Sequence, residues 1–254
     1  MELTITSADG TRLAVRRQGR GPAVVLVHGS AGGLDSFDPI APYLEEQFEL
    51  WVYARRGYAP SDTCRRPKIF DDDVADLRAA IAATGREAHV VGASYGAMVA
   101  LHGAAEARSV ALFEPPLFAA GDGTALKPYR RLVHEGRIGA ANRLFAEQVA
   151  RVPAAMLGDG EIEGDPREAI GCLHDLEAMA ADDPAVSRWA AVSVPTLIMQ
   201  GGDTWAPMPA TMDALAAAIP KATRVVLPGQ SHFATHTAPE LFAAELTKFL
   251  TAAV

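Results

Sequence analysis

The hydrophobic pattern of the chain consists of short apolar runs separated by longer amphipathic stretches. Polar and apolar residues alternate over 3–6 and 13–17, on either side of Asp9-Gly10, which predicts an antiparallel hairpin. Residues 23–27 are continuously apolar, as expected for a strand that is covered on both faces. Further strands are predicted at 48–53, 88–91, 109–113, 195–199 and 223–227.

Helical periodicity fills much of the chain between these strands. Apolar residues recur at helical spacing over 70–81 and 242–250, and Asp71 to Asp73 lie in the first helical turn, where the helix dipole favours acids. Strands that alternate with helices predict an α/β fold, with a mostly parallel sheet and helices on both faces. Between 115 and 193 the strands stop, so we expect a helical lid there and a core made of 1–114 and 194–254.

The composition and net charge disfavour several classes of protein. The chain has 254 residues, 49% of them hydrophobic, and a formal net charge of -8, which disfavours nucleic acid and anionic membranes as partners. The two cysteines are expected to be free thiols, and no stretch resembles a signal peptide or a membrane span. We therefore expect a cytoplasmic protein, monomeric or homodimeric, that acts on a small molecule.

The stretch Gly92-Ala93-Ser94-Tyr95-Gly96 carries the strongest chemical signal. It reads G-x-S-x-G between a predicted strand and a predicted helix, which is the pattern of a nucleophile elbow. The tight turn presents the serine hydroxyl at the edge of the sheet, and the following helix N-terminus favours developing negative charge. Ser94 is thus the predicted nucleophile.

A serine nucleophile needs a base, and seven histidines are available. The predicted base is His232, in the loop between the last strand and the last helix. His28 is interpreted as structural, with its ring holding a loop, and His89 lies within a strand. A metal pair between His232 and His236 is disfavoured because no further ligands are suitably spaced. The other three are expected to be solvated or packed on helices: His102, His134 and His174.

Two carboxylates compete to orient the base. Asp203 follows the 195–199 strand and gives the chain order serine, acid, histidine, so it is the preferred prediction. Glu114 ends the 109–113 strand at the same edge of the sheet. It could replace Asp203, form a hydrogen bond in the substrate pocket, or turn the chain before Pro115-Pro116.

Backbone N–H groups are expected to hold the oxyanion of the reaction. One is that of Tyr95, the residue after the nucleophile. The second is assigned to Ser30, with Ala31 as the alternative, in the loop His28-Gly29-Ser30-Ala31-Gly32-Gly33. Trp205, Met208 and Phe233, which neighbour the predicted acid and base, are candidates for the wall of an apolar pocket.

Together these segments resemble the α/β-hydrolase superfamily along nearly the whole chain. The resemblance is carried by VLVHGSAGG at 25–33, YARRGYAPSD at 53–62, VVGASYGAMVA at 90–100, LIMQGGDTWAP at 197–207 and LPGQSHFA at 227–234. It implies an eight-stranded, mostly parallel sheet, a helical cap, and no metal or organic cofactor. In one departure, Tyr53-Ala54-Arg55-Arg56-Gly57 lacks the acid that relatives often carry there. The two arginines are interpreted as structural, with binding of an anionic substrate group as the alternative.

The predicted function is a serine hydrolase that cleaves a carboxylic ester, a lactone or a thioester of a largely apolar small molecule. Members of the same superfamily use this triad as cofactor-free perhydrolases (haloperoxidases), C–C bond hydrolases or lyases, and these remain alternatives. A ligand-binding protein on a hydrolase scaffold is a further alternative, which the complete set of serine, acid and histidine disfavours.

Overall fold

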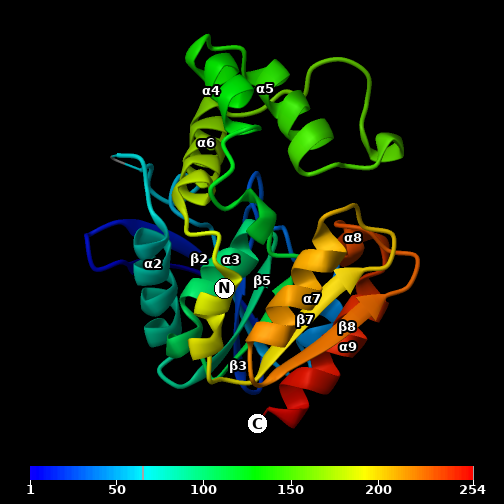
Figure 1. Cartoon of the computed structure of the whole chain (residues 1–254). Coiled ribbons are helices and arrows are strands. Elements are labelled where there is room, and N and C mark those ends of the chain that lie inside the picture. The colour runs from blue at the N-terminus through cyan, green and yellow to red at the C-terminus, as the bar shows by residue number, and fades with distance from the viewer. Residues whose placement is uncertain (65, 254) are drawn as a thin grey trace.

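The computed structural model, which describes residues 1–64 and 66–253, contains an eight-stranded sheet. Its strand order is β1-β2-β4-β3-β5-β6-β7-β8 (Figure 1). The strand bounds are β1 Glu2–Thr6, β2 Arg12–Gly19, β3 Ala23–Val27, β4 Glu49–Tyr53, β5 Ala88–Ala93, β6 Ser109–Phe113, β7 Thr196–Gly201 and β8 Ala222–Leu227. Every strand predicted from the hydrophobic pattern is present, within one or two residues at each end.

Only the N-terminal part of the sheet is antiparallel. β1 pairs with β2, and β2 pairs with β4, in antiparallel registers, which confirms the predicted hairpin. β4, β3, β5, β6, β7 and β8 are parallel to one another. The carboxyl ends of these six strands therefore meet at one edge of the sheet, where binding sites of open α/β sheets form.

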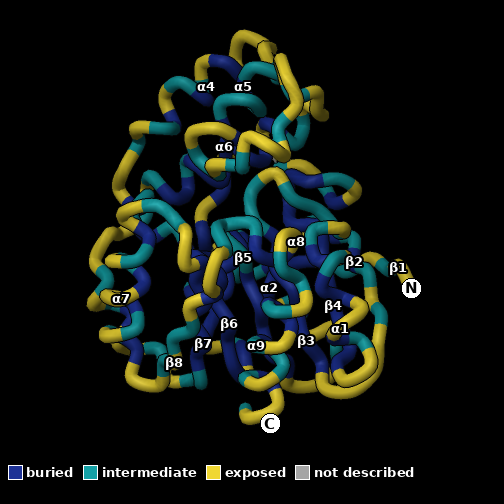
Figure 2. Tube along the Cα trace, turned by 90° about the vertical axis from the view of Figure 1, so that its right-hand side faces the viewer, coloured by how far each residue is buried: buried dark blue, intermediate teal, exposed yellow. Residues whose placement is uncertain are grey.

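Helices cover both faces of the sheet, as predicted. On one face lie α2 Phe70–Ala83, α3 Tyr95–His102 and α7 Met208–Ala218, and on the other lie α1 Ala41–Leu44, α8 Ala234–Thr237 and α9 Pro239–Ala252. Strand β3 shows how the two cores are separated. Val25 and Val27 join the first hydrophobic cluster, whereas Val24 and Leu26 join the second. The central strands are accordingly buried throughout (Figure 2).

A helical insertion, residues 115–193, separates β6 from β7. It contains the α-helices α4 Leu126–His134, α5 Ile138–Leu144 and α6 Pro166–Ala181. It also contains the 3-10 helices η2 Leu117–Ala119, η4 Ala154–Met156 and η5 Val186–Ala191, and the π-helix η3 Phe145–Val149. A further 3-10 helix, η1 Ala104–Glu106, follows α3. In Figure 1 the insertion lies above the carboxyl ends of the strands. Within residues 1–64 and 66–253, no helix has the length and apolar character needed to cross a bilayer.

The loop after β3 is held by His28, whose side chain is fully buried. The Nε2 atom accepts a hydrogen bond from the backbone N–H of Arg55 at 2.9 Å, so the ring proton lies on Nδ1 and is donated to the carbonyl oxygen of Gly29 at 2.7 Å. Burial, together with the nearby charge of Arg55, lowers the pKa of His28 from 6.5 to about 3. His28 thus stays neutral in the folded protein and serves the structural role predicted for it.

This buried neutral histidine predicts a loss of stability in mild acid. Below about pH 6.5 the unfolded chain takes up a proton on His28 that the folded chain does not bind until about pH 3, so acid favours unfolding in that window. The slope for one proton approaches about 1.4 kcal/mol per pH unit. In urea titrations between pH 7.5 and 5, His28→Gln is expected to flatten this dependence. Circular dichroism at pH 7.5 would verify that the variant is folded, and equal slopes would contradict the assignment.

Candidate active site

Ser94 lies in the sharp turn between β5 and α3, as predicted from G-x-S-x-G. Its backbone has φ 54° and ψ -122°, a strained conformation for a residue with a side chain. The flanking glycines are required by close backbone approach. A Cβ on Gly96 would lie 2.0 Å from the carbonyl oxygen of Val27, and one on Gly92 would lie 2.2 Å from that of Gly96. The turn therefore holds Ser94 in one position at the carboxyl edge of the sheet.

Ser94 lines a cavity of about 770 Å³ between the sheet and the helical insertion. His232 lines the same cavity, so the structure brings the predicted nucleophile and the predicted base to one site. In the described part of the chain no hydrogen bond joins the two side chains. Hydrogen bonds of this type are often long before substrate is bound.

The carboxylate that holds His232 is Glu114. The Nδ1 atom of His232 lies 2.6 Å from Glu114 Oε2, and the second oxygen, Oε1, accepts the backbone N–H of Gly201 at 2.9 Å. Glu114 is fully buried at the end of β6, with a positive φ of 46°. A carboxylate on Nδ1 leaves Nε2 of the ring available to accept a proton from a nucleophile.

Asp203 does not occupy this position, although it was the preferred prediction for the acid. Its backbone N–H donates to the carbonyl oxygen of Gln230 at 2.8 Å, and its side chain is exposed. Asp203 is kept from this position by the packing of the loops that follow β7 and β8. A Cβ on Gly201 would lie only 2.4 Å from Gln230 O, so the backbones after β7 and β8 run against each other, and the buried space beside the imidazole is filled by the side chain of Glu114. The alternative that the sequence left open is the arrangement found here.

The two backbone N–H groups that were predicted to hold an oxyanion belong to Tyr95 and Ser30. Tyr95 begins α3, and its N–H, like that of Ser30, has no hydrogen-bond partner among the described residues. A Cβ on Gly29 would lie 3.1 Å from Ser94 Cβ, so the loop after β3 approaches the nucleophile closely. Ala31, the alternative to Ser30, already donates its N–H to Tyr58 Oη at 3.3 Å.

The residues predicted for the pocket wall differ in their placement. Phe233 lines the cavity. The ring of Trp205 lies 5.3 Å from that of His232, edge to face, so it contacts this histidine and does not line the cavity. Met208 is fully buried in the core beneath this loop. Glu114 reaches the site only through His232.

Both arginines of the Tyr53–Gly57 stretch are held by carboxylates. Arg55 is fully buried and binds Asp175 of α6, with Nη2 2.7 Å from Oδ2. Arg56 donates to Asp76 through Nε at 2.7 Å and to Asp9 through Nη1 at 2.9 Å. These pairs correspond to the structural interpretation of the two arginines.

Three further charged residues near the site were not identified from the sequence: Lys68, Asp73 and Asp175, each 2% exposed or less. Asp73 was assigned only to the helix dipole, yet its Oδ2 accepts the hydroxyl of Tyr95 at 2.8 Å. A signal for Asp175 was present. It lies three residues after Cys172, on the apolar side of α6, where an unpaired carboxylate would be costly.

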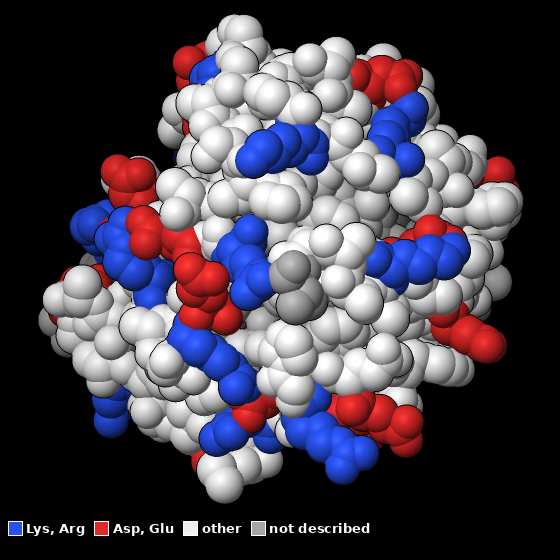
Figure 3. All heavy atoms as spheres, turned by 90° about the horizontal axis from the view of Figure 1, so that it is seen from below, with Lys and Arg blue, Asp and Glu red and all other residues white. Residues whose placement is uncertain are grey.

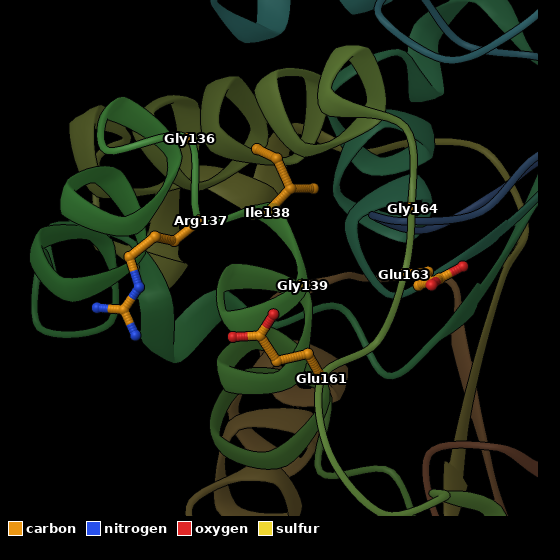
Figure 4. Close-up of a pocket in the computed structure, with 7 residues that line it drawn as sticks. All are labelled: Gly136, Arg137, Ile138, Gly139, Glu161, Glu163 and Gly164. Carbon is orange, nitrogen blue, oxygen red and sulfur yellow. The ribbon is translucent and has the colours of Figure 1, made fainter.

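A second hollow, of about 850 Å³, lies within the insertion and contains none of the predicted catalytic residues. Figure 4 shows it between the turn at 136–139 and the extended segment at 161–164. Glu163 and Gly164 line both this hollow and the cavity at Ser94. The 161–164 segment therefore forms a wall that the two share.

Comparisons with known proteins agree with this architecture. A model of the alpha/beta hydrolase family matches residues 24–245. The solved structure of an alpha/beta hydrolase from Sphaerobacter thermophilus is 31% identical, with a TM-score of 0.82 over 98% of this chain and all of that one. A 2-(acetamidomethylene)succinate hydrolase of Mesorhizobium japonicum is 26% identical over 94% of this chain and 92% of its own length.

A third, shorter match is to an uncharacterized hydrolase of Bacillus subtilis. It is 33% identical, but over only 36% of this chain and 35% of that protein. The family model, in contrast, spans the elbow, Glu114 and the histidine loop. With the eight-stranded sheet and the position of Ser94, this match shows that the chain belongs to the alpha/beta hydrolase family.

Proposed function

We propose that this protein is a serine hydrolase that cleaves a carboxylic ester of a small, largely apolar molecule. The observation that carries the proposal is the shared cavity, in which Ser94 on its strained turn faces the same space as His232, and His232 is held by buried Glu114. A nucleophile, a base and a group that orients the base are the parts that acyl transfer requires.

In the proposed reaction, Ser94 Oγ attacks the ester carbonyl carbon while Nε2 of His232 takes the hydroxyl proton. Glu114 stabilises the resulting imidazolium through Nδ1. The N–H groups of Tyr95 and Ser30 stabilise the oxyanion. His232 then donates the proton to the leaving alcohol, and a water molecule, activated in the same way, hydrolyses the acyl-enzyme to release the acid and restore Ser94.

The helical insertion is proposed to act as a cap that encloses the substrate. Its contribution to the cavity wall is mostly apolar and includes Phe145, Ala146, Val152, Met156 and Ile162. A cavity of about 770 Å³ with such a lining suits a small apolar acyl or alcohol group. The molecular face opposite the insertion has basic and acidic side chains interspersed (Figure 3), which favours a small molecule over a nucleic acid as the partner.

The charge of the cavity further narrows the substrate. Among the described residues, Arg16 is the only arginine or lysine that lines the cavity, and it is paired with Asp38. Four carboxylates also line it: Asp35, Glu163, Asp165 and Glu168. A substrate with its own carboxylate would be repelled there. The proposed substrates are therefore neutral esters, unlike the dicarboxylate named for the Mesorhizobium japonicum relative.

The proposed nucleophile is tested by Ser94→Ala. Hydrolysis of p-nitrophenyl hexanoate is expected to fall to the level of buffer alone, because the variant lacks the hydroxyl that attacks the ester. Mass spectrometry after treatment with a fluorophosphonate should find the label on Ser94 in the wild type and none in the variant. Unchanged esterase activity in the folded variant would remove Ser94 from the mechanism.

The identity of the acid is tested by comparing Glu114→Gln with Asp203→Asn. Glu114→Gln is expected to lower kcat about 10³-fold or more, because the amide cannot stabilise the imidazolium and favours the wrong tautomer. Asp203→Asn is the matched control, and its kcat should stay within about twofold of the wild type because the side chain is exposed. The opposite ranking would return the acid to Asp203.

The substrate class is tested with two esters of the same leaving group. We expect kcat/KM for p-nitrophenyl butyrate to exceed that for p-nitrophenyl hemisuccinate by about tenfold or more at low salt, with the ratio shrinking as salt screens the charges. Glu163→Gln combined with Glu168→Gln should reduce the ratio. Equal rates for the two esters would contradict the proposed exclusion of anionic substrates.

A further inference from the structure

A buried carboxylate joins the helical insertion to the loop that approaches Ser94. Asp175, on α6, is fully buried and accepts from five donors. Its Oδ1 atom lies 3.0 Å from Arg55 Nη1 and 2.6 Å from Lys68 Nζ. Its Oδ2 atom lies 2.7 Å from Arg55 Nη2, 2.6 Å from Tyr58 Oη and 2.7 Å from Ser30 Oγ.

The charges around Asp175 balance. Asp73 Oδ1 lies 2.9 Å from Lys68 Nζ and 3.5 Å from Arg55 Nη1, so two cations face two carboxylates. Burial alone would raise the pKa of Asp175, but Arg55 and Lys68 hold it well below its ordinary value. Removing the four charges of this cluster (Arg55, Lys68, Asp73 and Asp175) from water costs free energy. Apolar residues of similar volume often stabilise a fold equally well. Stability alone therefore does not account for the presence of this buried cluster of charges.

The cluster contacts both residues that are proposed to bind the oxyanion. Ser30 donates its hydroxyl to Asp175, and Tyr95 donates its hydroxyl to Asp73. The guanidinium of Arg55 also lies 4.5 Å from the centre of the Tyr95 ring. Two separate chain segments that would supply oxyanion donors are thus fixed by the same buried charges.

The loop around Ser30 is held along its whole length. Arg55 donates from Nε to the carbonyl oxygen of His28 at 2.9 Å and from Nη2 to that of Gly29 at 3.1 Å. Tyr58, which donates to Asp175, accepts the N–H of Ala31. With these carbonyl groups and side chains held, the direction of the Ser30 N–H is fixed.

We infer that Asp175 is a positioning residue for the oxyanion hole, and that it links the seating of the helical insertion to catalysis. It lies in the insertion, yet its contacts orient Ser30 directly and the rest of the loop through Arg55 and Tyr58. When α6 is seated on the core, the Ser30 N–H points toward the reacting carbonyl oxygen. This inference rests on the proposed serine-hydrolase function.

Ser30→Ala tests the link with the least disturbance. The variant keeps the backbone N–H and leaves Asp175 with its other four donors, so the fold should persist. We expect kcat for p-nitrophenyl hexanoate to fall about tenfold with KM unchanged, since a donor is misaligned and not removed. The inhibition constant of a trifluoromethyl hexyl ketone, whose adduct with Ser94 carries an oxyanion, should rise by the same factor.

The matched control is Glu177→Gln. Glu177 lies on the same helix as Asp175, but its Oε1 pairs with Arg130 of α4 at 2.9 Å, within the insertion. Its loss should leave kcat and ketone affinity unchanged. A second variant, Asp175→Asn, keeps the shape of the side chain but removes the charge, and it should lower kcat and ketone affinity at least as much as Ser30→Ala. A thermal unfolding curve of Asp175→Asn would give the temperature range in which this variant is folded and can be assayed.

The outcomes separate this inference from the proposed function. If Ser94→Ala is inactive while Ser30→Ala keeps kcat and ketone affinity within about twofold of the wild type, the hydrolase mechanism stands and the role of Asp175 is wrong. A rise in KM alone for Ser30→Ala would also overturn it, because that result indicates substrate binding and no effect on the transition state. If Ser94→Ala stays active, the proposed function itself fails.

Discussion

The close approach of α3 to β3 is the constraint on which the rest of the site depends. The carbonyl oxygen of Val27 lies only 2.0 Å from where a Cβ of Gly96 would be, so the helix can begin directly behind Ser94 only if residue 96 is glycine. This contact forces Ser94 into its strained backbone conformation and brings the loop after β3 beside the nucleophile. Strain at one residue is stable here because buried strands and a buried helix surround it. The position of the hydroxyl is therefore a consequence of backbone packing.

The sheet also explains why Glu114 holds the imidazole. β5 and β6 are neighbours, and Ser94 N donates to Phe113 O at 2.8 Å, so Ser94 and Glu114 leave adjacent strands at the same level. The histidine loop follows β8, two strands farther along. A glutamate at the end of β6 spans this gap within the interior, with one oxygen on Gly201 N and the other on His232 Nδ1. The carboxylate is thus anchored to the backbone of β7, the strand that lies between the two.

The sequence could predict those features that depend on local pattern. Alternating polar and apolar residues located β1 and β2, apolar runs located the other strands, and the glycines of residues 92–96 located the elbow. A central strand such as β3, which is buried on both faces, has little freedom in composition. The sequence favoured Asp203 over Glu114, whereas it is Glu114 that contacts His232. Both residues follow strands at the same edge, and only the reach of each side chain distinguishes them. The position of Asp175 on the apolar side of α6 was a signal in the sequence, but its partners could not be predicted, for a related reason. Its partners lie more than 100 residues away in sequence, as the spacing of 120 to Arg55 and 145 to Ser30 shows.

The buried charges beside this site fix the orientation of their partners, which apolar packing does not do. An apolar contact between α6 and the core would tolerate small shifts in any direction, because dispersion and hydrophobic forces are weakly directional. A carboxylate with five donors tolerates few such shifts, since each displaced donor would be left buried and unpaired. Such a contact fixes orientation at the cost of desolvation. Orientation is what an oxyanion hole requires, because its donors must point to the place where charge develops before the charge forms.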